Sequence, residues 1–172
     1  MKQPLNTNDY AKLSVENLLD IISDKFHKEI QETFDTVNLQ LKIAHKLEPL
    51  EEELEFALVM VGEIEKKFTE HIEKEEILLF PILGVTKKRT GVYGEENDTE
   101  EFISDLKSEH DILKTQFSQI RKATNQYTCE PSSTPSHKLA YAQLNDLEQD
   151  INRLFFVEEE YLFPRVLRVQ HK

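Results

Sequence analysis

The sequence predicts an all-α protein, an antiparallel up-down-up-down four-helix bundle, from three observations. Residues that favour helices are common, and only 4 glycines and 6 prolines occur among the 172 residues. Apolar residues recur at spacings of three and four over long stretches, as they do on one face of a helix. Proline-containing breaks divide these stretches into four segments, and short breaks between long helices predict antiparallel neighbours.

Local signals place the ends of the four helices. The first begins after Ser14, whose side chain suits a helix N-cap, and stops before Pro49. The third opens at the pattern Asp98-x-x-Glu101, which resembles a capping box, and the fourth follows the proline-rich turn 131–135. The predicted helices cover about residues 14–47, 51–80, 98–127 and 136–163 or a little further.

The two halves of the chain repeat at a fixed offset of 83 residues. The stretch HIEKEEILLFP at 71–81 matches LFFVEEEYLFP at 154–164, and His27 matches His110. Several matches at one offset indicate an internal duplication, of 14–83 in 98–168. We therefore predict a polar lead-in over 1–13 and a single bundle domain over 14–168.

His71 and Glu75, four residues apart, share one face of the second predicted helix and lie within its apolar stripe. A buried imidazole and carboxylate need a partner such as a metal ion, and the alternative is a solvated pair at a helix edge. Counting from the two turns places one layer of the bundle at His27, His71, His110 and Leu154, with Glu75 and Glu158 one helical turn away. Nitrogen and carboxylate ligands in a bundle core suit a transition metal.

The remaining histidines and the single cysteine are expected to lie away from this cluster. His45 is about 27 Å of helix from His27, so the two cannot bind one centre. His137, beside the proline-rich turn, and His171, in the tail, are expected to be solvated. Cys129 has no neighbouring His–carboxylate pair to activate it, and one cysteine excludes an internal disulfide.

Composition restricts the partners. The formal net charge of −12 argues against nucleic acid and anionic membranes. The longest apolar run, 77–85, is interrupted by Pro81 and Gly84 and is too short to span a bilayer. The N-terminal residues contain no apolar signal core, so we expect a cytoplasmic protein without a nucleic-acid or membrane partner.

The stretches HIEKEEILLFP, SEHDIL and EEEYLFPR resemble the motifs of hemerythrin-like domains, and are closest to the di-iron family called repair of iron centres. KAT-x-x-Y at 122–127, the proline-rich turn and the closing LFPR are similar to that family in order and spacing. The resemblance covers about 14–168 and implies two irons held by histidines of both halves and bridged by two carboxylates. Carried over position by position, it implies the ligands His27, His71, Glu75, His110 and Glu158.

The chain departs from the family pattern in three places, one of which is a shorter interval between His27 and His45. Leu154 stands where the resemblance implies a fourth histidine, and the family's N-terminal cysteine-containing domain has no counterpart in this sequence. Leu154 leaves three outcomes open: a lopsided di-iron centre with water, Asp150 or Tyr161 in the vacant place, a single metal, or a bundle without metal.

The resemblance implies a role in repairing damaged iron–sulfur or other iron centres, or in donating iron under oxidative or nitrosative stress. Damaged iron–sulfur proteins and a small diatomic ligand, O2 or NO, are the corresponding partners. The alternatives are a non-catalytic sensor or carrier of O2, NO or iron, and a metal-free interaction bundle. No motif outside the His/Glu cluster indicates turnover of an organic substrate, and the sequence leaves open whether the protein is an enzyme.

Overall fold

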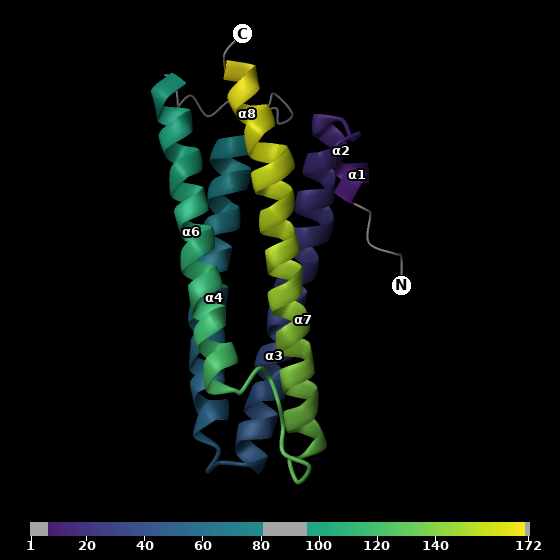
Figure 1. The fold of residues 1–172 in the computed structure, drawn as a ribbon, viewed down its shortest axis with the longest axis vertical. Helices are drawn as coiled ribbons and strands as arrows, with labels where there is room; N and C mark the ends of the chain where they lie inside the picture. The colour runs from purple at the N-terminus through teal and green to yellow at the C-terminus, as the bar shows by residue number, and fades with distance from the viewer. Residues whose placement is uncertain (1–6, 81–95, 171–172) are drawn as a thin grey trace.

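The computed structural model describes residues 7–80 and 96–170, and helices account for most of them (Figure 1). The helices are α1 (Thr7–Tyr10), α2 (Val15–Asp20), α3 (Lys28–Leu47), α4 (Glu52–Lys74), α6 (Glu96–Ala123), α7 (Pro135–Val157) and α8 (Phe163–Gln170). Three π-helical segments continue them, η1 (Ile21–His27), η2 (Glu75–Leu79) and η3 (Glu158–Leu162). The described residues contain no strand, and the predicted all-α four-helix bundle is confirmed.

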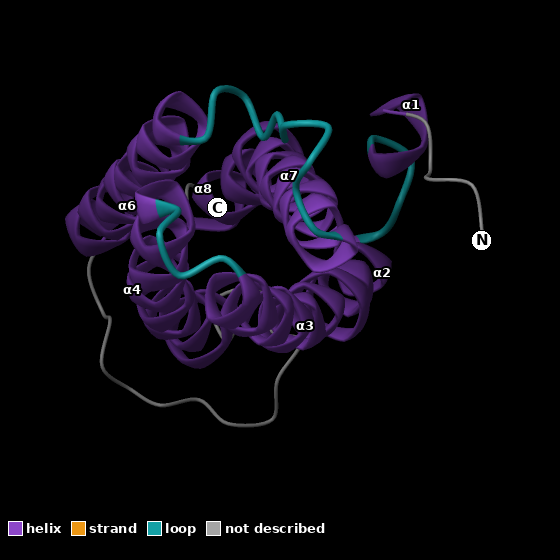
Figure 2. Cartoon of the chain, turned by 90° about the horizontal axis from the view of Figure 1, so that it is seen from below, coloured by secondary structure: helices purple, strands orange, loops and turns teal. Residues whose placement is uncertain are grey.

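Four long rods build the bundle: α2–η1–α3, α4–η2, α6, and α7–η3–α8. Viewed along its length, α3 packs between α4 and α7, and α6 packs against α4 (Figure 2). The connection between α3 and α4 and the one between α6 and α7 lie at the same end (Figure 1). Large side chains from all four rods fill the centre without solvent exposure, among them Phe34, Phe68, Phe117 and Phe155.

The ends of the first and last rods follow the expected capping chemistry. The Ser14 hydroxyl accepts a hydrogen bond from the Asn17 backbone N–H at 3.2 Å, as predicted. Thr134 caps α7 in the same way through the His137 backbone N–H, and Pro135 occupies the first helical turn, where its missing N–H costs nothing.

The predicted bounds of the third helix were wrong at both ends. Helix α6 begins at Glu96, so Asp98 lies inside the helix rather than at its cap. The helix also ends at Ala123, before the predicted end at 127, because residues 125–127 adopt left-handed backbone angles with φ of 46°, 61° and 59°. Residues in that conformation cannot continue a right-handed helix.

The three π-helical segments were not anticipated by the helical periodicity of the sequence. Segments η2 and η3 occupy equivalent places in the two halves, each beginning at a glutamate, and η1 ends at His27. π-Helical turns are uncommon and concentrate at functional sites. All three therefore indicate a functional site at one level of the bundle.

Part of the lead-in packs on the bundle. Tyr10 is buried, and the Arg165 guanidinium donates hydrogen bonds to the backbone carbonyls of Leu13, Tyr10 and Ala11 at 2.9–3.2 Å. The division into a lead-in over 1–13 and a domain over 14–168 stays a prediction. None of the described helices is long and apolar enough to cross a membrane.

Candidate metal centre

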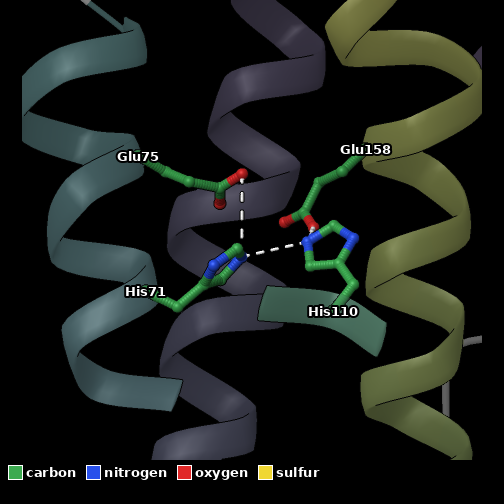
Figure 3. Close-up of side chains that lie close together, drawn as sticks. All are labelled: His71, Glu75, His110 and Glu158. Atoms are coloured by element: carbon green, nitrogen blue, oxygen red, sulfur yellow. Dashed lines mark hydrogen bonds and ion pairs between the residues drawn. The ribbon is translucent and has the colours of Figure 1, made fainter. Parts of the chain in front are cut away.

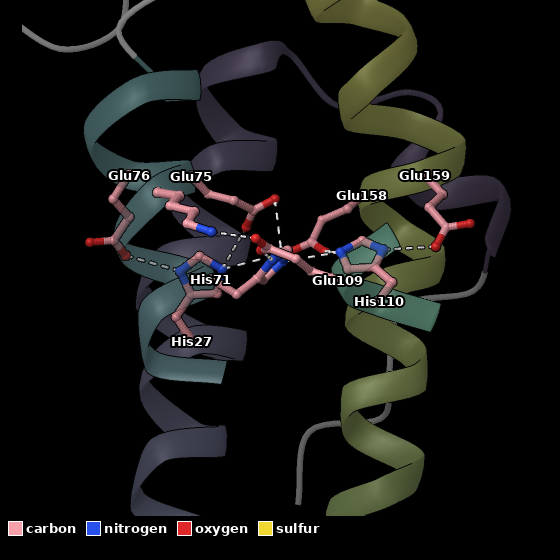
Figure 4. A network of polar contacts seen from close by, with 9 residues as sticks. His27, His71, Glu75, Glu76, Glu109, His110, Glu158 and Glu159 are labelled. Carbon is pink, nitrogen blue, oxygen red and sulfur yellow. Dashed lines mark hydrogen bonds and ion pairs between the residues drawn. The ribbon is translucent and has the colours of Figure 1, made fainter. Parts of the chain in front are cut away.

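Five polar side chains converge in the apolar core where the π-helical segments begin or end. They are His27 at the end of η1, His71 on α4, Glu75 at the start of η2, His110 on α6 and Glu158 at the start of η3 (Figures 3 and 4). Each is at most 2% exposed. The structure thus brings together all five residues that the sequence singled out.

Two histidines face one another across this cluster. The Nε2 atoms of His71 and His110 are 3.0 Å apart. On the same side, Glu75 Oε1 is 3.9 Å from His71 Nε2, and Glu158 Oε2 is 3.2 Å from His110 Nε2. The ligand atoms of these four residues all lie within 4.8 Å of one another, so one metal ion could contact all four (Figure 3). We call this group the two-histidine position.

The other carboxylate oxygens face His27. Its Nε2 atom is 3.4 Å from Glu75 Oε2 and 3.7 Å from Glu158 Oε1. Each glutamate therefore directs one oxygen to the two-histidine position and the other to His27. We call the group of His27 and these two oxygens the one-histidine position.

A glutamate also holds the outer nitrogen of each histidine, and we call Glu76, Glu109 and Glu159 the outer carboxylates (Figure 4). They accept hydrogen bonds from the Nδ1 atoms of His27, His71 and His110, in that order, at 2.9, 2.9 and 2.8 Å. A carboxylate on Nδ1 orients the ring and leaves the Nε2 lone pair for a metal, as is usual in metalloproteins.

The charged groups of the cluster shift one another's pKa values. Burial and the negative charge of Glu158 both raise the pKa of Glu75. Burial alone would also raise the pKa of Glu158, but the imidazoles of His110 and His27 outweigh it and hold that pKa below its ordinary value. Burial alone would lower the pKa of His27, but Glu158, Glu75 and Glu76 raise it to about 11.

The polar atoms of the cluster fit a metal better than they fit each other. Among the described residues, all four oxygens of Glu75 and Glu158 and the Nε2 of His27 are buried without a hydrogen bond of normal geometry. Unsatisfied buried carboxylates are costly, and a cation would satisfy them. The 3.0 Å between the His71 and His110 nitrogens is also about the separation of two neighbouring ligands roughly 2.1 Å from one metal.

Leu154 is fully buried in the core, where it can supply no ligand. Neither residue considered as a substitute is directed to the vacant place. Asp150 is 44% exposed and pairs with Arg153 at 3.2 Å, and Tyr161 packs its ring against Tyr10 and Phe156.

The expectation that His137 is solvated was wrong. It is only 5% exposed, and its Nδ1 lies 3.1 Å from Glu48 Oε2. Glu48 follows the last turn of α3, and it also accepts the Thr134 backbone N–H at 2.8 Å. The two connections at this end of the bundle pack together and cover the imidazole. The position of His137 beside a proline-rich turn did not indicate this cover.

His45 and Cys129 lie away from the cluster. His45 is half-buried in the last turn of α3, near the connection to α4. Cys129 is half-buried, and burial raises the pKa of its thiol, which disfavours the reactive thiolate. His171 lies outside the described residues.

Nothing in the sequence analysis singled out the outer carboxylates. A signal was present for two of them, because Glu76 and Glu159 repeat at the same offset as His27 and His110. Glu109 has no such counterpart, since Phe26 stands at the equivalent place. Only the packing of α6 on α4 brings it to His71.

Phe155 was also missed as a neighbour of the cluster. Its ring is fully buried and stacks on His110 with a centroid distance of 3.8 Å and an interplanar angle of 12°. It meets His71 edge-on at 5.8 Å. Phe155 therefore restricts the orientation of both rings of the two-histidine position.

Comparison with known proteins gives consistent matches. The family model described as the hemerythrin HHE cation-binding domain matches residues 21–166. The chain is 26% identical over 166 residues to a probable iron–sulfur cluster repair protein of Haemophilus influenzae, a match that covers 94% of this chain and 70% of that protein. It is 24% identical over 172 residues to the iron–sulfur cluster repair protein YtfE of Yersinia pestis, with 96% and 72% covered.

Proposed function

This chain belongs to the hemerythrin HHE family of cation-binding domains, and from that membership we propose that it is a non-haem iron protein. We propose that it acts in the repair of damaged iron–sulfur or other iron centres, or donates iron to them, under oxidative or nitrosative stress. The names of its relatives support this role, since the similarity extends over nearly the whole chain.

One observation carries the proposal. Two buried carboxylates, Glu75 and Glu158, each present one oxygen to a pair of imidazoles and the other to a third imidazole. Carboxylate and imidazole ligands suit iron, and inward-pointing Glu and His residues build di-iron sites in other helical bundles. The ligands that we propose are His27, His71, Glu75, His110 and Glu158, for two irons or one.

Bound iron would supply redox chemistry and the capacity to bind a small ligand, which no side chain of the cluster has by itself. The chain's own residues orient the imidazoles through the outer carboxylates. The surrounding aromatic rings, such as Phe155, keep bulk water away from the cluster. Damaged iron–sulfur proteins would then be partners to which iron is delivered as cargo.

Elemental analysis of protein purified without added metal tests the proposal. We expect one to two irons per chain, and we expect His71→Ala or Glu75→Ala to remove most of this iron. His45→Ala and Glu73→Ala are matched controls, because His45 lies near the far turn and Glu73 is exposed on α4. Iron-free wild-type protein with full thermal stability would overturn the proposal.

A second candidate is a sensor or carrier of O2 or NO that has no catalytic role. Its specific support is the enclosure of the cluster, whose five polar side chains are at most 2% exposed and would be reached by a very small ligand. An assay for reactivation of a damaged iron–sulfur enzyme separates the two candidates. Reactivation that depends on Glu75 supports repair, whereas spectral changes with NO but no reactivation support sensing.

A further inference from the structure

The two metal positions differ in more than one missing histidine. We propose that the two positions bind metal with unequal affinity: the two-histidine position retains its ion, and the one-histidine position holds the ion that is exchanged. This inference rests on the proposed function, because it specifies which of two irons in the same site is delivered.

The inner ligands give the first difference. The two-histidine position combines the Nε2 atoms of His71 and His110 with one oxygen from each bridging glutamate. The one-histidine position has a single imidazole, His27, and the two remaining oxygens. Fully buried Leu154 occupies the place equivalent to His71 and offers no ligand atom.

The outer carboxylates give a second, independent difference. Glu109 and Glu159 are 27% and 30% exposed, and each is paired with a lysine, Lys74 and Lys114 respectively. Glu76 is 44% exposed, and among the described residues its partners are His27 and the Ser23 hydroxyl at 3.4 Å. The carboxylate that orients His27 is therefore more exposed to solvent, and held by weaker contacts, than the carboxylates that orient the other two rings.

The internal repeat shows that the one-histidine position lacks several contacts that the two-histidine position has. An offset of 83 residues relates Lys114 to Gln31, which carries no charge, and relates Glu109 to Phe26, which cannot accept a hydrogen bond. The position equivalent to His71 thus lacks its imidazole and also the carboxylate that would orient one.

Charge balance is a further reason for the second ion to bind more weakly than the first, whichever position it takes. The bridging carboxylates, Glu75 and Glu158, carry two negative charges when both are ionised, and one divalent ion neutralises them. Glu109 and Glu159 are already paired with lysines, and the single charge of Glu76 offsets only part of a second divalent ion. A second divalent ion therefore adds net positive charge to a buried site, where it is poorly solvated. The second ion should bind more weakly and leave first.

Titration of the metal-free protein with Co²⁺ tests this inference. We expect two binding steps whose dissociation constants differ by at least about 100-fold, since outer partners alone change metal affinity by about 10–100-fold. His27→Ala should abolish the weak step and preserve the tight one. Leu154→His should tighten the weak step by about 10-fold or more.

A matched pair of substitutions gives a control that does not depend on the core substitution folding. Glu76→Gln and Glu159→Gln change equivalent outer carboxylates in the two halves. The first should weaken only the weak step, and the second only the tight step. Two equal steps, or a single step that His27→Ala does not affect, would overturn the inference while leaving metal binding intact. Absence of any step would overturn the proposed function as well.

Discussion

Glu109 offers the sharpest test of how the protein scaffold controls the metal centre. Its Oε2 accepts a hydrogen bond from His71 Nδ1 at 2.9 Å, and its Oε1 accepts one from Lys74 Nζ. The His71 and Lys74 contacts lower the pKa of Glu109 to about 2 although burial opposes them, so it is ionised at neutral pH. Glu109 itself is not expected to contact the metal, so its effect must pass through His71.

The expected magnitude follows from the kind of hydrogen bond that is lost. Glu109→Gln keeps an acceptor oxygen but removes the charge, and charged hydrogen bonds are worth about 1–1.5 kcal/mol more than neutral ones. The tight metal-binding step should therefore weaken about 10-fold. Glu109→Ala removes the acceptor altogether and should weaken it by up to about 100-fold, the upper range for outer partners.

Competition with a chromophoric chelator, using Co²⁺ and metal-free protein, measures the tight step directly. Glu70→Gln is the matched control, since Glu70 lines the same surface hollow between α4 and α6 but is exposed and pairs only loosely with Lys66, at 3.9 Å. We expect no change in the control. A Glu109→Ala protein that binds Co²⁺ within twofold of wild type would refute the claim that this carboxylate tunes His71.

Two further predictions concern stability. Phe155→Ala removes a fully buried ring stacked on His110, and should lower the free energy of unfolding of metal-free protein by about 3–5 kcal/mol in urea; a loss below about 1 kcal/mol would contradict the packing. At the other end, burial would raise the pKa of Glu48, but hydrogen bonds from Thr134 and His137 lower it below the ordinary 4.5. A lowered pKa stabilises the fold above pH 4.5 and loses that effect as the pH falls. The stability difference between wild type and Glu48→Gln should therefore be full at pH 7 and shrink below pH 4.5, and a difference constant down to pH 3 would refute this.

Helical periodicity was sufficient to predict the bundle and the level at which its polar residues meet. His27 and His71 are far apart in sequence, yet equal distances from one turn place them at one height, and the same holds for His110 and Leu154. That argument uses only the rise per residue of a helix and the antiparallel arrangement, which the structure reproduces.

The contacts around the proposed ligands could not be predicted from the sequence, because they depend on how each helix is rotated about its own axis. Glu109 is adjacent to His110 in sequence, so the two side chains point about 100° apart on α6, and only the neighbouring helix shows where Glu109 goes. The π-helical turns could not be predicted either, since one extra residue in a turn leaves almost no trace in an apolar pattern. His137 was misjudged because the cover over it comes from the other connection, 89 residues away in sequence.

The π-helical turns restrict where the chain can lose a residue. Segments η2 and η3 begin at the buried glutamates Glu75 and Glu158 and accommodate their extra residue within one widened turn. Deleting one residue there would let the helix relax to ordinary winding, but every later side chain would swing by about 100° around the axis. In the second half this would carry Phe163 away from its stack on His110 and would turn Arg165 away from the N-terminal carbonyls. A one-residue deletion in η3 is therefore expected to disturb the packing on His110, whereas the connections between the helices carry no such constraint.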